Sequence, residues 1–153
     1  MKKIAITAES ISTAMALTPL ENLGGGALAS FTGIARADSG VVALELEHYP
    51  GMTEQNLHAV ADAAMSRWSL LGCVLLHRVG KIAVGEQVVV VATAAHHRAE
   101  ALDACAFLID RLKTDATFWK KEHRTDGSAL WVEAKSTDEA RAEKWRQAEA
   151  EGS

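Results

Sequence analysis

The sequence predicts one α+β domain in which helices pack on a largely antiparallel β-sheet. Strand-like segments come in consecutive pairs before each of two long segments with helical periodicity, and further strands separate these two helices. The 153 residues, 48% hydrophobic and 24% charged, have the length and composition of one folded domain. No internal repeat or composition boundary divides the chain, so we expect a single domain over residues 1–153.

The first 25 residues contain few periodic signals. We expect residues 1–25 to form an irregular lead-in that holds one short strand at 4–7. The glycine run at 24–26 lacks the GK[ST] ending of a phosphate-binding loop. A flexible connection is therefore the expectation for this run.

Two strands and a helix are predicted next. Residues 27–34 and 41–49 are strand-like, and the turn-forming residues 37–40 lie between them. A Pro-Gly pair ends the second strand, and a helix over residues 53–68 follows it. The apolar residues of this helix fall on a single face: Leu57, Val60, Ala61, Ala64 and Trp68.

The middle of the chain repeats the pattern of strands before a helix. Residues 74–77 and 79–84 are two short strands or two parts of one bent strand, and the valine-rich segment 87–93 suits a strand buried on both faces. A helix is predicted over 98–113, and residues 119–132 are expected to form a hairpin. The predicted inner face of this second helix holds Leu102, Cys105, Ile109 and Leu112.

The sequence predicts a third helix in the C-terminal segment, residues 136–153. Ser136 and Glu139 have the spacing of a capping box, which marks a helix start. The final residues are expected to fray. The remaining residues, 26–135, hold the strands and both long helices.

Composition excludes several classes of function. The formal net charge is −4, from 16 Lys and Arg against 20 Asp and Glu, which argues against a binder of nucleic acid or of anionic membranes. No apolar run is long enough to span a membrane, and Glu9 interrupts the N-terminal apolar segment too early for a secretory signal. Cys73 and Cys105 lie in apolar stretches, so we expect buried, reduced thiols and a cytoplasmic location.

Cations nevertheless gather at particular places: Arg36 after a strand, His96-His97-Arg98 at a strand-to-helix junction, Lys113 at a helix end and Lys120-Lys121 after Trp119. Each one alone is most simply a solvated surface charge. Unpaired backbone N–H groups at a helix start attract anions, so the junction is a candidate anion site. The adjacent histidines do not suit a metal site, because neighbouring side chains point apart.

Taken together, ordered motifs over residues 26–135 resemble the large, catalytic subunit of molybdopterin synthase. The first two are FTGIAR at 31–36 and LEHYPGM at 46–52. The others follow in order: HRVG at 77–80, VGE at 84–86, AHHR at 95–98, LKT at 112–114, FWKKE at 118–122, Gly127, and WVE at 131–133. Each motif is weak alone, and the ordered set is specific.

The resemblance implies an α/β hammerhead fold and a central homodimer. A small ubiquitin-like sulfur carrier would bind at each end, which makes a heterotetramer, and would insert its thiocarboxylated Gly-Gly tail into the active site. The substrate would be cyclic pyranopterin monophosphate, and the product the molybdopterin dithiolene of the molybdenum cofactor. The family implies no metal and no redox cofactor, because the carrier brings the sulfur.

The resemblance also implies roles for six residues of this chain. Lys113 and Lys120 match the catalytic lysines, and the substrate-binding positions fall on Arg36, His97, Arg98 and Lys135. Lys135 stands where close relatives have arginine, so a point charge replaces a bidentate donor.

Several alternatives stay open at this point. They concern which lysine performs which proton transfer, and whether His97 is an acid/base or a phosphate ligand. A non-catalytic pterin- or phosphate-binding module and a carrier-docking scaffold of the same fold are the alternative functions.

Overall fold

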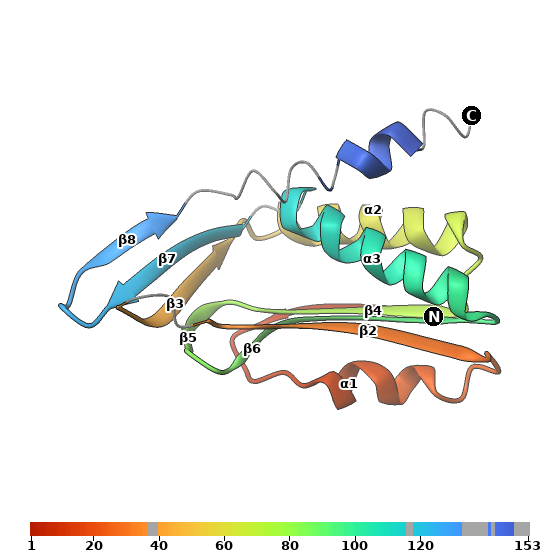
Figure 1. Ribbon diagram of the computed structural model, residues 1–153, viewed down its shortest axis with the longest axis horizontal. Helices are drawn as coiled ribbons and strands as arrows, with labels where there is room; N and C mark the ends of the chain where they lie inside the picture. The colour runs from red at the N-terminus through yellow and green to blue at the C-terminus, as the bar shows by residue number, and fades with distance from the viewer. Residues whose placement is uncertain (37–39, 116–117, 133–140, 142, 149–153) are drawn as a thin grey trace.

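The computed structural model describes residues 1–36, 40–115, 118–132, 141 and 143–148 (Figure 1). It confirms an α+β fold with mostly antiparallel strands, and it divides the expected sheet into two four-stranded sheets. Sheet A has the order β1-β4-β6-β2, and sheet B has the order β5-β3-β7-β8. The strands are β1 Lys2–Thr7, β2 Ala27–Ile34, β3 Val41–His48, β4 Gly72–Arg78, β5 Gly80–Ala83, β6 Gln87–Ala95, β7 Phe118–Arg124 and β8 Ala129–Val132.

The chain passes from sheet A to sheet B between β4 and β5. The expectation left open whether these segments were one bent strand, and the structure places them in different sheets. Val79 separates them, and its backbone N–H donates to the carbonyl of Thr7, 2.9 Å away. Gly80 follows with φ = 82°, a left-handed conformation that costs glycine little.

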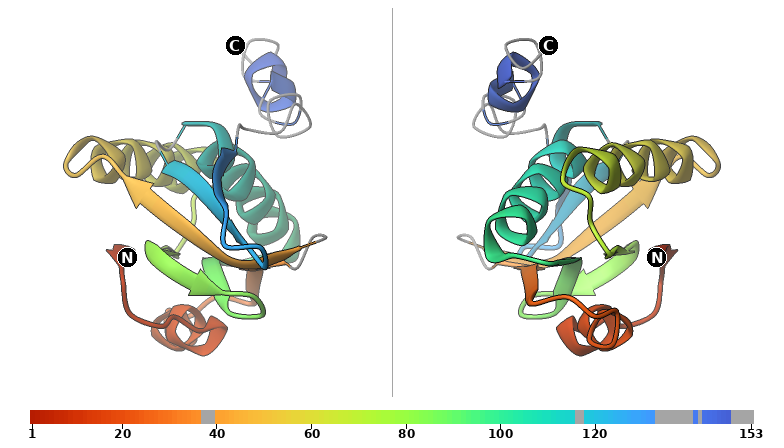
Figure 2. Two further views of the ribbon diagram at one scale, coloured as in Figure 1. Left: turned by 90° about the vertical axis from the view of Figure 1, so that its left-hand side faces the viewer. Right: turned by 90° about the vertical axis from the view of Figure 1, so that its right-hand side faces the viewer.

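Helices cover both faces of sheet A. The long helices α2, Met52–Arg67, and α3, Arg98–Asp115, lie on one face, and α1, Thr13–Leu17, lies on the other (Figures 1 and 2). On β6, Val89 and Val91 pack toward the long helices while Val90 packs toward α1. The valine-rich strand is therefore buried on both faces, as predicted, and both long helices lie where the periodicity placed them.

The lead-in is the largest correction to the predicted organisation. Besides β1, which pairs in parallel with β4, it contains α1 and a 3₁₀ turn at Thr18–Leu20. Ala16 and Leu20 are buried under sheet A. A five-residue helix presents little more than one turn, which is too short for a periodic signal in the sequence.

The glycine run is a close passage of two backbones, and the expectation of a flexible connection was wrong. A Cβ atom on Gly25 would lie 2.5 Å from the carbonyl oxygen of Ala95, and one on Gly26 would lie 2.6 Å from that of His96. Both distances are shorter than any real Cβ contact, so the positions require glycine.

The inner face of α3 differs from the predicted one at Leu102. Its side chain is 60% exposed, whereas Phe107 and Leu108 are fully buried between the helix and its neighbours. Cys105 and Leu112 are buried as expected, and Ile109 is partly buried. The buried face follows the two elements that α3 contacts, α2 and sheet A, and so it is wider than one stripe and rotated from the predicted one.

The predicted hairpin is present as β7 and β8, with its turn at Asp126-Gly127. The Asp126 carboxylate accepts hydrogen bonds from the backbone N–H and the hydroxyl of Ser128, at 2.8 and 2.6 Å. The predicted start of the C-terminal helix at Ser136 and Glu139 lies outside the described residues, while residues 143–148 are helical.

Candidate active site

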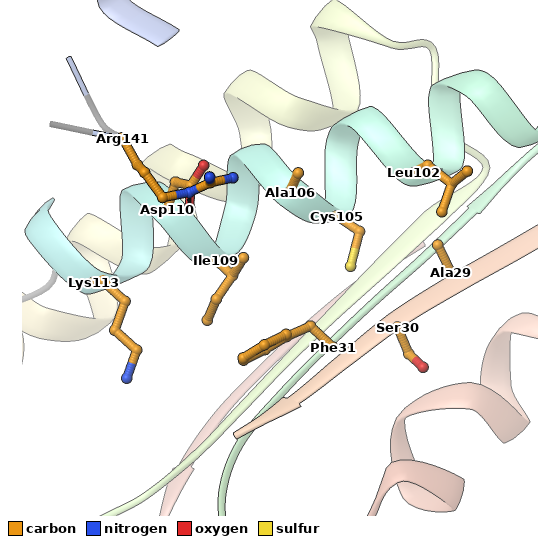
Figure 3. A pocket seen from close by; sticks show the side chains of 10 residues that line it. All are labelled: Ala29, Ser30, Phe31, Leu102, Cys105, Ala106, Ile109, Asp110, Lys113 and Arg141. Atoms are coloured by element: carbon orange, nitrogen blue, oxygen red, sulfur yellow. Dashed lines mark hydrogen bonds and ion pairs between the residues drawn. The ribbon is translucent and has the colours of Figure 1, made fainter. Parts of the chain in front are cut away.

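A cleft of about 460 Å³ lies between β2, an edge strand of sheet A, and α3 (Figure 3). Its walls are mainly apolar, and Lys113, Asp110 and Arg141 supply the charges. Lys113, Ile109 and Phe31 surround one end of the cleft. The complete lining is Ala29, Ser30, Phe31, Leu102, Cys105, Ala106, Ile109, Asp110, Lys113 and Arg141.

Asp110 anchors the C-terminal helix beside this cleft. Its buried carboxylate accepts hydrogen bonds from Arg141 Nε at 2.9 Å and from Trp145 Nε1 at 2.7 Å. The Trp145 ring also packs edge-on against Phe107 and Trp68. These contacts hold the Arg141 side chain at the cleft, which sequence reasoning did not foresee, although an aspartate among apolar residues of a helix was a signal for a buried partner.

Lys113 lies in the last turn of α3 and is exposed. A cation is stabilised there by the negative end of the helix dipole. His77, at the end of β4, lies close enough for the charge of Lys113 to act on it. Burial above all, with a smaller contribution from Lys113, lowers the pKa of His77 to about 3, although the hydrogen bond to the Arg78 carbonyl acts in the opposite direction. His77 is therefore neutral throughout the physiological pH range.

Lys120 and Arg36 lie where the two sheets meet. Lys120 on β7 pairs with Leu46 on β3, so the two side chains share one face of sheet B. Leu46 packs in a small buried cluster with Ala35, the residue before Arg36. Phe118, two residues before Lys120, stacks on His77, beside Lys113. The structure thus brings Arg36, Lys113 and Lys120 to one region around the end of α3.

The loop that carries Arg36 is held by backbone and side-chain contacts. The N–H of Ala35 donates to the carbonyl of Glu86 at 2.9 Å, and the N–H of Gly85 donates to the carbonyl of Ala35 at 2.8 Å. The Glu86 carboxylate forms an ion pair with Arg78, which is buried. The motifs at 77–80 and 84–86 therefore meet and fix the backbone next to Arg36.

His97 and Arg98 lie at the opposite end of α3, and both are exposed. Fifteen residues separate Arg98 from Lys113, which corresponds to about 22 Å along an α-helix. Within one chain, the two predicted groups of cations therefore do not meet at one small substrate. Lys135, the sixth predicted residue, lies outside the described residues.

The other described residues bear on three further kinds of feature: a metal site, a membrane-spanning helix and a reactive cysteine. Over the described ranges, no three His, Cys, Asp or Glu side chains gather in a way that could hold a metal ion. None of the helices among these residues is both long enough and apolar enough to cross a membrane. Cys73 and Cys105 are free and buried, and burial raises the pKa of each thiol to about 11.

Comparison with known proteins gives concordant results for family and fold. The model of the MoaE protein family matches residues 6–115, including most of the lead-in. The molybdopterin synthase catalytic subunit of Mesorhizobium japonicum is 52% identical over 123 residues, which cover 79% of this chain and 77% of that protein. That of Cereibacter sphaeroides is 50% identical over 123 residues, or 80% of this chain and 84% of that protein.

Solved structures of related proteins have the same fold. The molybdopterin biosynthesis MoaE protein of Burkholderia ambifaria has a TM-score of 0.80 and 43% identity, covering 95% of this chain and 98% of that one. A molybdopterin synthase structure from Staphylococcus aureus has a TM-score of 0.79 and 29% identity, covering 87% and 98%.

Proposed function

The chain belongs to the MoaE family, and from that membership we propose that it transfers sulfur to cyclic pyranopterin monophosphate to form the molybdopterin dithiolene. It is an enzyme of molybdenum cofactor biosynthesis, as its relatives named molybdopterin synthase catalytic subunit are. The sulfur donor in this proposal is a small ubiquitin-like carrier whose C-terminal Gly-Gly ends in a thiocarboxylate.

The gathering of Arg36, Lys113 and Lys120 around the end of α3 is the observation that carries the proposal. Both reactants are anions: the pterin has a cyclic phosphate and the carrier tail has a thiocarboxylate. Bringing them together costs electrostatic repulsion, which fixed cations offset through charge-assisted hydrogen bonds. The formal net charge of the chain is −4, so a local group of positive charges is not what its overall composition would give.

The cleft between β2 and α3 suits an extended carrier tail. Its wall at Phe31 is apolar, and Lys113 stands at one end. A Gly-Gly tail has no side chains, so its backbone passes between close walls that would reject bulkier residues. We place the thiocarboxylate near the Lys113 end.

In this proposal the two lysines supply the acid–base and electrostatic chemistry. Across the two transfers, two C–S bonds form on the pterin and the C–S bonds of two thiocarboxylates break. One sulfur replaces a pterin oxygen, and the other replaces an ester oxygen of the cyclic phosphate, which opens to a monoester. One water supplies the remaining oxygen, so that both carriers end as carboxylates. An ammonium group polarises the thiocarboxylate carbonyl or returns a proton to the departing oxygen. The reaction moves no net electrons, so the proposal includes no redox cofactor. The two ammonium groups take the electrostatic role, so the proposal includes no metal.

We further propose a homodimer that completes the site, because one chain keeps Arg98 about 22 Å from Lys113. Positions 98 and 113 are symmetric about a point between residues 105 and 106 of α3, and so are positions 102 and 109. Two antiparallel copies of α3 related by a two-fold axis would place the partner's Arg98 near Lys113 and would cover the exposed Leu102 with the partner's Ile109. His97 would then reach the substrate from the partner, as an acid/base or as a phosphate ligand.

Light scattering tests this assembly. We expect a dimer at micromolar concentration and a heterotetramer with two carriers after the carrier is added. A Leu102→Glu variant should shift the protein toward monomer, because it buries a charge within the proposed interface. A wild-type chain that stayed monomeric would contradict the homodimer, and equal binding of a carrier without its last two residues would contradict the tail channel.

One reconstitution separates the proposed activity from the alternatives. The chain is mixed with thiocarboxylated carrier and cyclic pyranopterin monophosphate, and dithiolene formation is measured. Product formation supports the sulfur transfer. Retention of the pterin without product would indicate a binding module, and carrier binding alone would indicate a docking scaffold.

A further inference from the structure

His77 is a buried histidine that the proposed chemistry does not use. It lies at the end of β4, is 4% exposed, and stands where the chain leaves sheet A for sheet B. Its Nδ1 atom lies 2.8 Å from the carbonyl oxygen of Arg78. A carbonyl only accepts, so Nδ1 carries the proton and the ring is fixed in one tautomer and one orientation.

The His77 ring stacks face to face on Phe118. The two ring centroids are 3.9 Å apart and the ring planes are 13° from parallel. Phe118 is the first residue of β7, the strand that carries Lys120. On its other side, Phe118 pairs in register with His48 of β3.

This stack connects two parts of the molecule that have no strand pairing between them. Among the described residues, β7 pairs with β3 and β8 only, and no ladder joins sheet B to sheet A. The position of β7 relative to α3 and sheet A therefore depends on the connecting segments of the chain and on side-chain contacts, and not on strand pairing. The His77–Phe118 stack is such a contact: His77 lies near enough to Lys113 to be affected by its charge, and Phe118 stands two residues before Lys120 on β7.

We propose that His77 is a positioning residue for sulfur transfer: by stacking on Phe118 it fixes Lys120 relative to Lys113. This role rests on the function proposed above. A neutral ring suits the place, because a protonated one would add a positive charge near Lys113 and would repel it. Catalytic geometry is sensitive to shifts of about 1 Å, so a loosened β7 lowers the rate even where both lysines are present.

The test is a set of variants in the reconstituted reaction with carrier and cyclic pterin. His77→Ala and Phe118→Leu each remove one ring of the stack, and His77→Phe keeps a stacking ring. His58→Ala is the matched control, because His58 is exposed on α2. Circular dichroism checks that each variant is folded, and proton NMR checks the stack through the ring-current shift that Phe118 imposes on the His77 ring protons.

We expect His77→Ala and Phe118→Leu each to lower kcat by about tenfold to a hundredfold, with KM for the pterin within about threefold of the parent. The double variant should be no slower than the slower single one, because both substitutions remove the same contact. His77→Phe should recover most of the lost rate, and His58→Ala should match the parent.

Three results would overturn the role of His77. They are a folded His77→Ala with kcat within threefold of the parent, a loss confined to KM, and a His77→Phe as slow as His77→Ala. If His77→Ala does not fold, Phe118→Leu and His77→Phe decide the question. A parent that formed no dithiolene would overturn the proposed function and this role with it, whereas an active parent with unimpaired variants would overturn the role alone.

Discussion

The two ends of α3 carry similar charges in very different surroundings. At its C-terminal end, Lys113 adjoins an apolar cleft and a buried, neutral His77. At its N-terminal end, His97 and Arg98 are exposed and lie next to a close backbone passage at Gly25 and Gly26. Lys113 is exposed as well, so the difference lies in its neighbours: an apolar wall and a rigid, buried ring stand beside it. His97 and Arg98, at the N-terminal end of α3, would gain a wall and rigid neighbours of this kind only from a second copy of the chain.

The largest expected effect on dithiolene formation comes from a substitution at the C-terminal end of α3. Lys113→Ala should reduce dithiolene formation by at least about a hundredfold, because it removes the ammonium group nearest the proposed thiocarboxylate. The fold should persist, since the side chain is exposed at a helix end. Single-turnover measurements with saturating carrier and pterin give the rate. Activity within a few-fold of the parent would remove Lys113 from the catalytic role.

Lys120→Ala should be nearly as severe, and the strand itself offers the control. Lys121 is the next residue on β7, so its side chain points to the other face, where its ammonium lies 5.1 Å from the centre of the Trp131 ring. Lys121→Ala should keep activity within about twofold of the parent. Equal losses in the two variants, measured in the same assay, would show that β7 has only a structural role.

Arg36 and Arg98 are assigned to opposite ends of α3, so their variants compare the two ends directly. Arg36→Ala and Arg98→Ala should each weaken pterin binding by roughly tenfold to over a hundredfold, the cost of about 1.5–3 kcal/mol for one charged hydrogen bond. Carrier binding should change little. Calorimetric titration of each ligand measures both effects, and an equal loss of the two ligands would assign the arginines to the carrier tail.

Mixing inactive variants tests whether the two ends meet across a dimer. Lys113→Ala and Arg98→Ala chains, each impaired alone, are unfolded and refolded together in equal amounts. Half of the resulting dimers carry one chain of each kind, and one site in each of these is intact, so about a quarter of the parent activity should return. The absence of any recovery in dimers shown to have exchanged subunits would mean that each site is formed by one chain.

The smallest expected effect concerns the stability of the protein in acid, through His77 near the C-terminal end of α3. Burial lowers the pKa of His77 to about 3 in the folded chain, against an ordinary value of 6.5, so below pH 6.5 protons bind the unfolded chain preferentially. Stability should therefore fall with pH from 6.5 toward 3, by about 1.4 kcal/mol per pH unit and about 2 kcal/mol between pH 7 and 5. Urea unfolding at both pH values should show this loss in the parent and a smaller one in His77→Phe. Identical losses would contradict the buried, neutral state of His77.

Local patterns in the sequence were enough to predict most elements. The strands at 27–34 and 41–49, both long helices and the hairpin turn at Asp126-Gly127 were predicted close to their observed positions, because periodicity, caps and turn residues act over a few neighbours. Residue type and position along the chain also singled out five of the six candidate residues, and only the resemblance supplied Lys135. The resemblance then gave them roles.

Only the tertiary structure decided which of these elements and residues meet. The division into two sheets, the packing of the lead-in under sheet A and the exposure of Leu102 all depend on contacts between distant segments. The stack of His77 on Phe118 joins residues 41 positions apart, and the length of α3 keeps Arg98 from Lys113 within one chain. Such pairings follow from packing the whole chain around its cores, and no pattern among neighbouring residues encodes them.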